Sequence, residues 1–292
     1  LQLANTVNPL ESSDPLSTTP DSDKDKIQPP NSPESSKEEP RVLISEVIIQ
    51  GIEGHPEQEK LELAAYASIP LRPRSRVTRR ELKLALDEVY STGLFSGVKI
   101  EPVNGPLGVQ LLVKVQPNPV LNKVQLEPKN LRLPPEVVKT IFQADFGKTL
   151  NLNLLQLRMQ QLQSWYVKEG YSLARISGPN RITSKGVVQL KVLEGKVAGV
   201  EVQFLNKEGQ STNETGEPVR GKTKIWLVSR EISIQPGEVF NRNQLESDIK
   251  RIYSTSLFSD VKVTIKPVPG GPGKITIILG ITEQSTGSLS GG

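Results

Sequence analysis

The feature that most constrains the fold is an internal repeat. Residues 77–100 read VTRRELKLALDEVYSTGLFSGVKI and residues 240–263 read FNRNQLESDIKRIYSTSLFSDVKV, and ten positions are identical when the two are aligned without gaps. The identities include a Ser-Thr-x-Leu-Phe-Ser segment that begins at Ser91 in one copy and at Ser254 in the other. A chain with such a repeat is expected to fold as similar modules, each with its own small core.

A more divergent third copy lies between these two, around the sequence LQSWYVKEGYSLARI. In our alignment Tyr166 takes the place of Tyr90, and Tyr171 takes the place of Phe95. Ala174 then corresponds to Val98. The chain therefore carries three modules, of which the middle one has diverged most.

Each copy predicts a helix, because apolar residues recur with helical spacing on one face, at Leu82, Leu86, Val89 and Tyr90 in the first copy. Thr78 and Asn241 precede the helices of the first and third copies and suit the N-cap position. A shorter helix is expected before each of these, over residues 56–67, 135–143 and 223–232.

Strands are expected on both sides of each helix pair, because apolar and polar residues alternate there. Asn104-Gly105 predicts a hairpin turn in the first module, and residues 270–273, with the sequence GGPG, predict one in the third. The element order is therefore β-α-α-β-β three times. This is an α+β fold in which two helices cover one face of a three-stranded mixed sheet. We predict modules at 41–117, 118–194 and 195–283.

The first forty residues differ in composition from the rest. They hold seven prolines, seven serines, three lysines and eight acidic residues, which gives a net charge of 3 − 8 = −5. Such a segment buries too little apolar surface to fold, so we predict a disordered leader over 1–40. The remainder has 33 basic and 24 acidic residues, a net charge of +9, which suits lipid head groups. Its cations are scattered without an aromatic stripe, so no nucleic-acid partner is expected.

The sequence offers no catalytic constellation. It contains no cysteine, and its single histidine, His55, lies in a Gly-His-Pro turn. The glycine-rich stretch at 270–273 lacks the Lys-Ser/Thr of a phosphate-binding loop. We therefore predict no enzymatic activity and no cofactor or metal.

Three recurring features carry a family resemblance. They are a Gly-x-x-(Leu/Phe)-Asn helix start, a Tyr-Ser-Thr-Gly-Leu-Phe or Tyr-x-x-x-Gly-Tyr helix exit, and a closing hairpin. This pattern, over residues 41–283, resembles the POTRA domain. Three such domains behind an acidic leader resemble the cyanobacterial and plastid-type relatives of BamA outer-membrane assembly factors. Residues 284–292 resemble the point where that family's transmembrane barrel begins.

The resemblance implies an arm at the periplasmic face of the outer membrane that receives unfolded outer-membrane β-barrel proteins and delivers them to its own C-terminal barrel. Periplasmic accessory proteins and lipid head groups are further expected partners. An extended substrate would add to the edge formed by the second strand of each module. The residues expected at these edges are Val98, Lys99, Ile100, Ala174, Arg175, Ile176, Val261, Lys262 and Val263.

Two further regions are candidates for function. The connection from Leu205 to Thr223 is long for a compact domain, and we expect it to gate the barrel mouth, unless it is only a tolerated insertion. Its candidate residues are Asn206, Glu208, Glu214 and Arg220. The joints contain Pro117, Pro119 and Gly195, and we expect the second joint to be the more rigid.

Two alternatives remain open at this stage. The arm of a two-partner secretion transporter would recognise one dedicated substrate through the same kind of domain. A structural scaffold would bind periplasmic partners and never the substrate.

Overall fold

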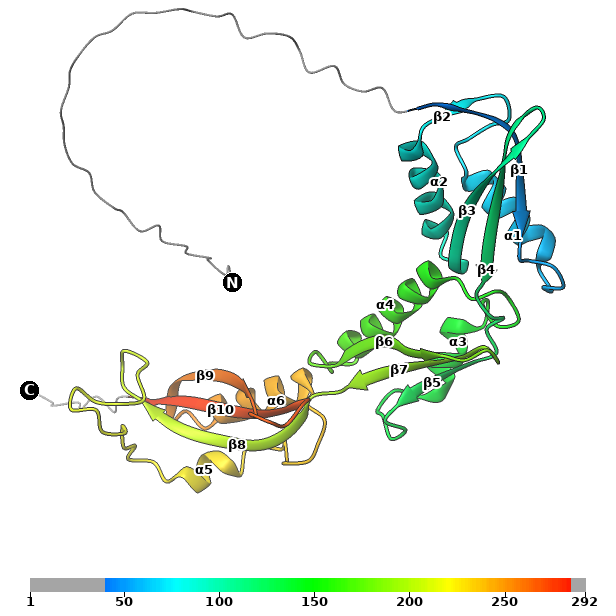
Figure 1. Cartoon of the computed structure of the whole chain (residues 1–292). Coiled ribbons are helices and arrows are strands. Elements are labelled where there is room, and N and C mark those ends of the chain that lie inside the picture. The colour runs from blue at the N-terminus through cyan, green and yellow to red at the C-terminus, as the bar shows by residue number, and fades with distance from the viewer. Residues whose placement is uncertain (1–39, 285–292) are drawn as a thin grey trace, which may run out of the picture. The chain divides into compact units, whose positions relative to one another are not determined.

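The computed structural model describes residues 40–284, which form three separate β-sheets along the chain (Figure 1). We call the parts that form these sheets module 1, module 2 and module 3, in chain order. The predicted leader, apart from Pro40, and the predicted barrel start, apart from Gln284, lie outside the described residues. The module limits at 117/118 and 194/195 remain predictions.

Module 1 contains two helices and four strands: β1 (Val42–Gln50), α1 (Gln58–Ser68), β2 (Arg76–Val77), α2 (Arg79–Ser91), β3 (Phe95–Gly105) and β4 (Gly108–Pro117). Its sheet has the order β2-β1-β4-β3, with β1 and β4 parallel and the other pairs antiparallel. The prediction of three strands was therefore wrong here. The short β2 pairs Val77 with Val42, and a strand of two residues has too little sequence for periodicity to reveal it.

Modules 2 and 3 have the predicted β-α-α-β-β order. Module 2 consists of β5 (Lys123–Glu127), α3 (Pro135–Phe142), α4 (Leu152–Lys168), β6 (Arg175–Ile182) and β7 (Val187–Leu193). Module 3 consists of β8 (Lys196–Leu205), α5 (Ile225–Ser229), α6 (Arg242–Ser254), β9 (Phe258–Pro267) and β10 (Lys274–Glu283). In each sheet the opening strand pairs in parallel with the last strand, which is central, and the second strand pairs antiparallel with it. The predicted mixed α+β fold is confirmed.

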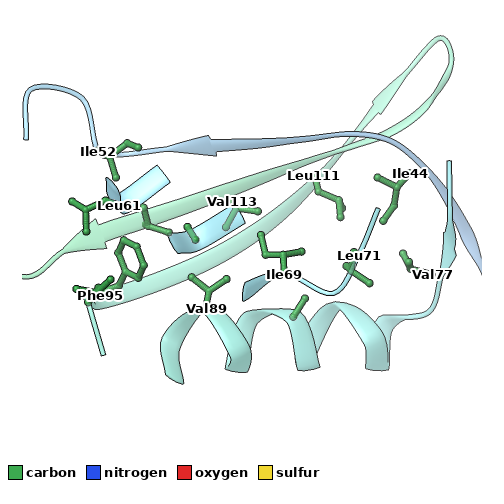
Figure 2. Packing of buried hydrophobic residues seen from close by; sticks show 14 residues of the cluster. Ile44, Ile52, Leu61, Ile69, Leu71, Val77, Val89, Phe95, Leu111 and Val113 are labelled. Atoms are coloured by element: carbon green, nitrogen blue, oxygen red, sulfur yellow. The ribbon is translucent and has the colours of Figure 1, made fainter. Parts of the chain in front are cut away.

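Each module has its own hydrophobic core between its sheet and its helices. In module 1 the core side chains of Leu111 and Val113 on the sheet and of Val89 on α2 point into the space between the sheet and the helix (Figure 2). Alternate residues of β4 and β7 are buried, as expected for a sheet that is covered on one face, whereas β10 is buried continuously over residues 277–281. Three small cores, rather than one large one, are what the repeat predicted.

The predicted helix caps are confirmed. The Thr78 hydroxyl accepts a hydrogen bond from the backbone N–H of Glu81, and the Glu81 carboxylate accepts one from the backbone N–H of Thr78. Asn241 caps α6 through its side-chain oxygen. These local contacts define where α2 and α6 begin.

The predicted apolar helix face was partly wrong. Tyr90 and Tyr253 are 49% and 41% exposed, whereas Tyr166 is fully buried. Tyr166 thus shares the buried environment of Val89 and Ile252 rather than that of Tyr90. Burial, and then a 2.8 Å hydrogen bond to Glu194, raise the pKa of the Tyr166 hydroxyl. The middle copy is therefore shifted by one residue from our alignment.

Two local predictions also need correction. Asn104 and Gly105 pair with Val109 and Gly108 inside the ladder, so the hairpin turns at Pro106-Leu107. Proline suits the first central position of a turn, which explains the displacement. The helix expected over 223–232 is only the five residues of α5. The loop expected at 270–273 does join β9 to β10.

Within residues 40–284, no helix is long and apolar enough to cross a membrane.

Candidate functional site: sheet edges and module joints

The strand that follows the second helix of each module, predicted as the second strand, occupies an outer position in its sheet. These strands are β3, β6 and β9. The predicted residues on them are Val98, Lys99, Ile100, Arg175, Ile176, Val261, Lys262 and Val263. The opening strands β5 and β8 form the opposite edges of their sheets. An outer strand turns alternate backbone N–H and C=O groups away from its sheet, so each of these strands offers groups to which another strand can bond.

Ala174 does not belong with the other edge residues. It precedes β6, its side chain is fully buried in the module 2 core, and its carbonyl accepts a hydrogen bond from Gln163 (2.8 Å). β6 begins only at Arg175, five residues after Gly170 at the helix exit, whereas β3 begins at Phe95, two residues after the equivalent Gly93. β6 itself changes register between Ser177 and Arg181, so its edge is less regular than that of β9.

β9 presents the most regular of the three edges. The backbone N–H of Val261 donates to the Tyr253 hydroxyl on α6 at 3.0 Å, so this N–H points away from β10. Because strand geometry repeats every two residues, the N–H groups of Val263 and Ile265 point outward as well. The side chains of Val261 and Val263 pack against the module 3 core, so a partner strand would meet their backbone.

The equivalent edge strand of module 1, β3, offers fewer outward backbone N–H groups than β9. In the repeat, Pro102 corresponds to Ile265, and proline has no N–H to offer. On the exposed face of this sheet Glu101 lies between Lys114 (2.6 Å) and Lys99 (2.8 Å). Hydrogen bonds from Lys114 and then Lys99 hold the pKa of Glu101 at about 2. Lys99 therefore belongs to an ion-pair cluster on the outer face.

The long connection of module 3 spans residues 206–224, whereas the equivalent connections span 51–57 and 128–134. It is organised by its own hydrogen bonds. The Asn206 side chain accepts from the backbone N–H of Gln210 (2.8 Å), and Asn213 accepts from the backbone N–H of Glu217 (2.8 Å). The carboxylate of Glu283, at the end of β10, accepts from the backbone N–H groups of Lys222 and Thr223. The predicted loop residues Glu208, Glu214 and Arg220 are exposed along it, and Asn206 is half-buried.

The joint between modules 1 and 2 is formed by side chains that sequence reasoning missed. The helix start of α4 bonds to the helix exit of α2: the Leu152 N–H donates to the Gly93 carbonyl (2.8 Å), and the Asn151 side-chain amide donates to the Thr92 carbonyl (3.0 Å). Asn153 adds a third bond, to the Ser91 carbonyl at 2.8 Å. The end of one repeat thus receives the beginning of the next.

Asn118 and Glu57 reinforce this first joint. The buried Asn118 amide donates to the carbonyls of Gly93 (3.0 Å) and Leu150 (2.9 Å). The Glu57 carboxylate accepts from the backbone N–H and the hydroxyl of Thr149, at 2.5 and 2.6 Å. Partial burial would raise the pKa of Glu57, but hydrogen bonds from Lys60 and Thr149 outweigh it and hold the pKa at about 2.

The joint between modules 2 and 3 repeats the same pattern. The Arg242 N–H donates to the Gly170 carbonyl (2.8 Å), and the Asn241 amide donates to the Glu169 carbonyl (2.8 Å). Gly170 has a φ of 89°, and a Cβ there would lie 2.6 Å from the Asn241 Oδ1. Only glycine fits this left-handed position against the next module.

The three predicted hinge residues lie beside these bonds. The Pro119 carbonyl accepts from the Leu150 N–H, the Gly195 carbonyl accepts from the Phe240 N–H, and Pro117 ends β4. More side-chain hydrogen bonds cross the first joint than the second, so hydrogen bonding does not favour a stiffer second joint. Bending at either joint stays a prediction. The signal for the joints was in the sequence, because Asn-Leu-Asn at 151–153 and Asn-Arg-Asn at 241–243 recur at the same place.

Comparison with known proteins agrees with this architecture. Residues 120–195 match the ShlB-type POTRA domain, and residues 222–284 match the POTRA family described as a surface antigen variable number repeat. The structure of POTRA1-3 of the periplasmic domain of Omp85 from Anabaena is 39% identical, with a TM-score of 0.72, and the match covers 85% of this chain and 98% of that one. The N-terminal domain of Omp85 from Thermosynechococcus elongatus is 38% identical, with a TM-score of 0.74, over 85% of this chain and all of that one.

Among curated proteins, the chloroplastic outer envelope protein 80 of Oryza sativa is 30% identical over 256 residues. That match covers 87% of this chain and 37% of the relative, so the chain spans little more than a third of the relative's length. The fold and the repeated joints define an array of three POTRA domains. The chain belongs to the Omp85 family.

Proposed function

We propose that this array is the periplasmic arm of an outer-membrane assembly factor and that it binds unfolded outer-membrane β-barrel proteins by strand addition. The observation that carries the proposal is the outer position of β9. This strand pairs with β10 in a regular antiparallel ladder, and its N–H groups at Val263 and Ile265 point outward, where a further strand could pair with them. Main-chain pairing is indifferent to side-chain identity, which suits a receptor for many different strands.

The edge strands β3 and β6 offer a partner strand fewer regularly spaced backbone groups than β9 does. β3 offers Val98 and Ile100 but not Pro102, and β6 is interrupted at Gly178-Pro179. β9 therefore binds a longer extended segment than either of them. Because module 3 would be adjacent to a C-terminal membrane barrel, a substrate held on β9 would be the one closest to insertion.

The connection over 206–224 is proposed to lie at the barrel mouth. Its bonds to Glu283 keep it at the end of β10, where the chain leaves module 3. A loop held there would narrow the entrance through Asn206, Glu208, Glu214 and Arg220. The remaining proposed partners are periplasmic accessory proteins and lipid head groups, at the periplasmic face of the outer membrane.

A backbone NMR titration of the whole chain with extended peptides from several unrelated outer-membrane barrels tests this function, with a polar peptide as control. Shifts concentrated on β9, and more weakly on β3, for all barrel peptides would support strand addition. Shifts confined to helices, or none at millimolar peptide, would leave the array as a scaffold for other partners.

A further inference from the structure

The beginning of α5 exposes two large apolar side chains. Ile225 is 50% exposed and Trp226 is 57% exposed, whereas Val228, on the inner side of the same short helix, is fully buried. Val228 fastens α5 to the module 3 core and leaves Ile225 and Trp226 facing away from it. No core requirement explains a tryptophan at that position.

Cations surround this apolar pair. The stretch from Arg220 to Arg230 contains Lys222 and Lys224 as well and has no acidic residue. The Arg230 guanidinium lies 5.7 Å from the centre of the Trp226 ring and also pairs with Glu231 at 2.9 Å. Among residues 40–284, no acidic side chain forms an ion pair with Lys222 or Lys224 (Nζ to carboxylate oxygen within 4.0 Å).

The exposed lysines and apolar side chains of residues 222–226 are held at one end of module 3. Lys222 and Thr223 donate their backbone N–H groups to Glu283, at 3.0 and 2.6 Å, and Gly221 packs so closely on Phe204 that a Cβ there would lie 2.1 Å from its ring. β8 and β10 are parallel, so the loop after β8 and the end of β10 share that end of the sheet, as Figure 1 shows. Ile225 and Trp226 follow Thr223 directly.

We propose that Lys222, Lys224, Ile225 and Trp226 form a contact surface for an anionic lipid bilayer. Tryptophan beside lysines is the composition of segments that lie in the membrane interface, where the ring enters the head-group layer and the cations meet lipid phosphates. The inference rests on the proposed function: if a membrane barrel follows module 3, the end that carries Glu283 faces the bilayer. The surface would then hold module 3 against the membrane.

The chain has only two tryptophans, so a Trp165→Phe background makes Trp226 the sole fluorescent reporter. We expect its emission to shift to the blue, and to become protected from acrylamide, when vesicles of phosphatidylcholine with phosphatidylglycerol are added to the whole chain. Pure phosphatidylcholine vesicles should give a much weaker response. In this background Lys222→Gln together with Lys224→Gln should weaken binding on the order of 30-fold, since each lysine near an anionic surface contributes about fivefold.

The matched control is Lys250→Gln together with Lys274→Gln, which removes the same charge from exposed positions of module 3 outside β9. An equal loss of vesicle affinity in both double variants would show that only net charge matters and would overturn the proposal. Trp226 emission that does not shift when anionic vesicles are added would overturn it as well. Peptide binding to β9, measured without lipid, should be the same in both variants. If no peptide bound to β9, the proposed function would be contradicted, but the lipid measurement would still test the membrane contact.

Discussion

The hydroxyl of Tyr253 accepts a hydrogen bond from the backbone N–H of Val261 at 3.0 Å, so a side chain of α6 covers one outward donor near the beginning of the edge strand β9. The same hydroxyl also approaches Asp260 (3.3 Å). A strand that adds to β9 must therefore either begin beyond Val261 or displace the tyrosine.

Replacing Tyr253 by phenylalanine should extend the usable edge by one donor. We expect Tyr253→Phe to tighten the binding of extended barrel peptides about two- to tenfold, the net effect of one more backbone hydrogen bond. Tyr90→Phe, at the equivalent site of module 1, is the control for loss of a hydroxyl. Unchanged affinity in Tyr253→Phe would show that peptides do not reach Val261.

The second joint depends on the absence of a side chain at Gly170. In Gly170→Ala the new Cβ would press on Asn241, so the bond from the Arg242 N–H to the Gly170 carbonyl should open. Amide hydrogen exchange at Arg242 should accelerate. Gly237→Ala is a matched control, because Gly237 has a similar φ of 93° with open space around its Cβ position. Equal exchange at Arg242 in both variants would contradict the role of Gly170.

The Glu57–Thr149 contact should respond to pH in a defined direction. The pKa of Glu57 is lowered from 4.5 to about 2 in the folded chain, so its ionised form stabilises the joint. This contribution is complete above pH 4.5 and is lost as the pH falls through about 2. The Thr149 amide resonance should follow that titration. Thr149→Val removes the hydroxyl and keeps the backbone N–H, so the Glu57 midpoint should rise part of the way toward 4.5, and an unchanged midpoint would show that the Thr149 hydroxyl does not hold the carboxylate.

The buried Asp248 is expected to be structural. Its carboxylate accepts from the backbone N–H groups of Ser233 (2.9 Å) and Ile234 (3.2 Å), and it pairs with Arg251. Asp248→Ala leaves those two donors without a partner and should destabilise module 3 by about 2–4 kcal/mol. Urea unfolding followed on β10 amide resonances measures this. Ser247→Ala, on the exposed face of α6, should have little effect, and a similar loss in both variants would argue against the role of Asp248.

The sequence predicted the parts of the fold that depend on neighbouring residues. The repeat, the helix caps at Thr78 and Asn241 and the β-α-α-β-β order all rest on short-range patterns. The structure has the caps, and it has this order in modules 2 and 3, while module 1 adds the short strand β2. Asp248 shows where such patterns end. It corresponds to Ala85 in the repeat and looks like a surface residue, but the loop before α6 folds back and buries it.

The hydrogen bonds at the joints could not be predicted from one module at a time, because they connect two modules. Asn151 and Asn241 were identifiable as helix-start residues, but their amide groups bond to carbonyls 59 and 72 residues earlier. Those partners become visible only when the modules are assembled. The error in the alignment of the middle copy has a simpler cause. Tyr166 and Tyr90 were matched by residue type, although one is buried and the other is exposed.

The most direct test of strand addition is the affinity of Ile265→Pro for extended barrel peptides. Proline removes one outward N–H of β9 and is already tolerated at the equivalent Pro102 of β3, so the sheet should remain folded. Strand addition predicts a loss of about tenfold or more relative to Ile265→Ala, which keeps the N–H. Equal affinity of the two variants, with β9 and β10 intact by NMR, would contradict binding at this edge.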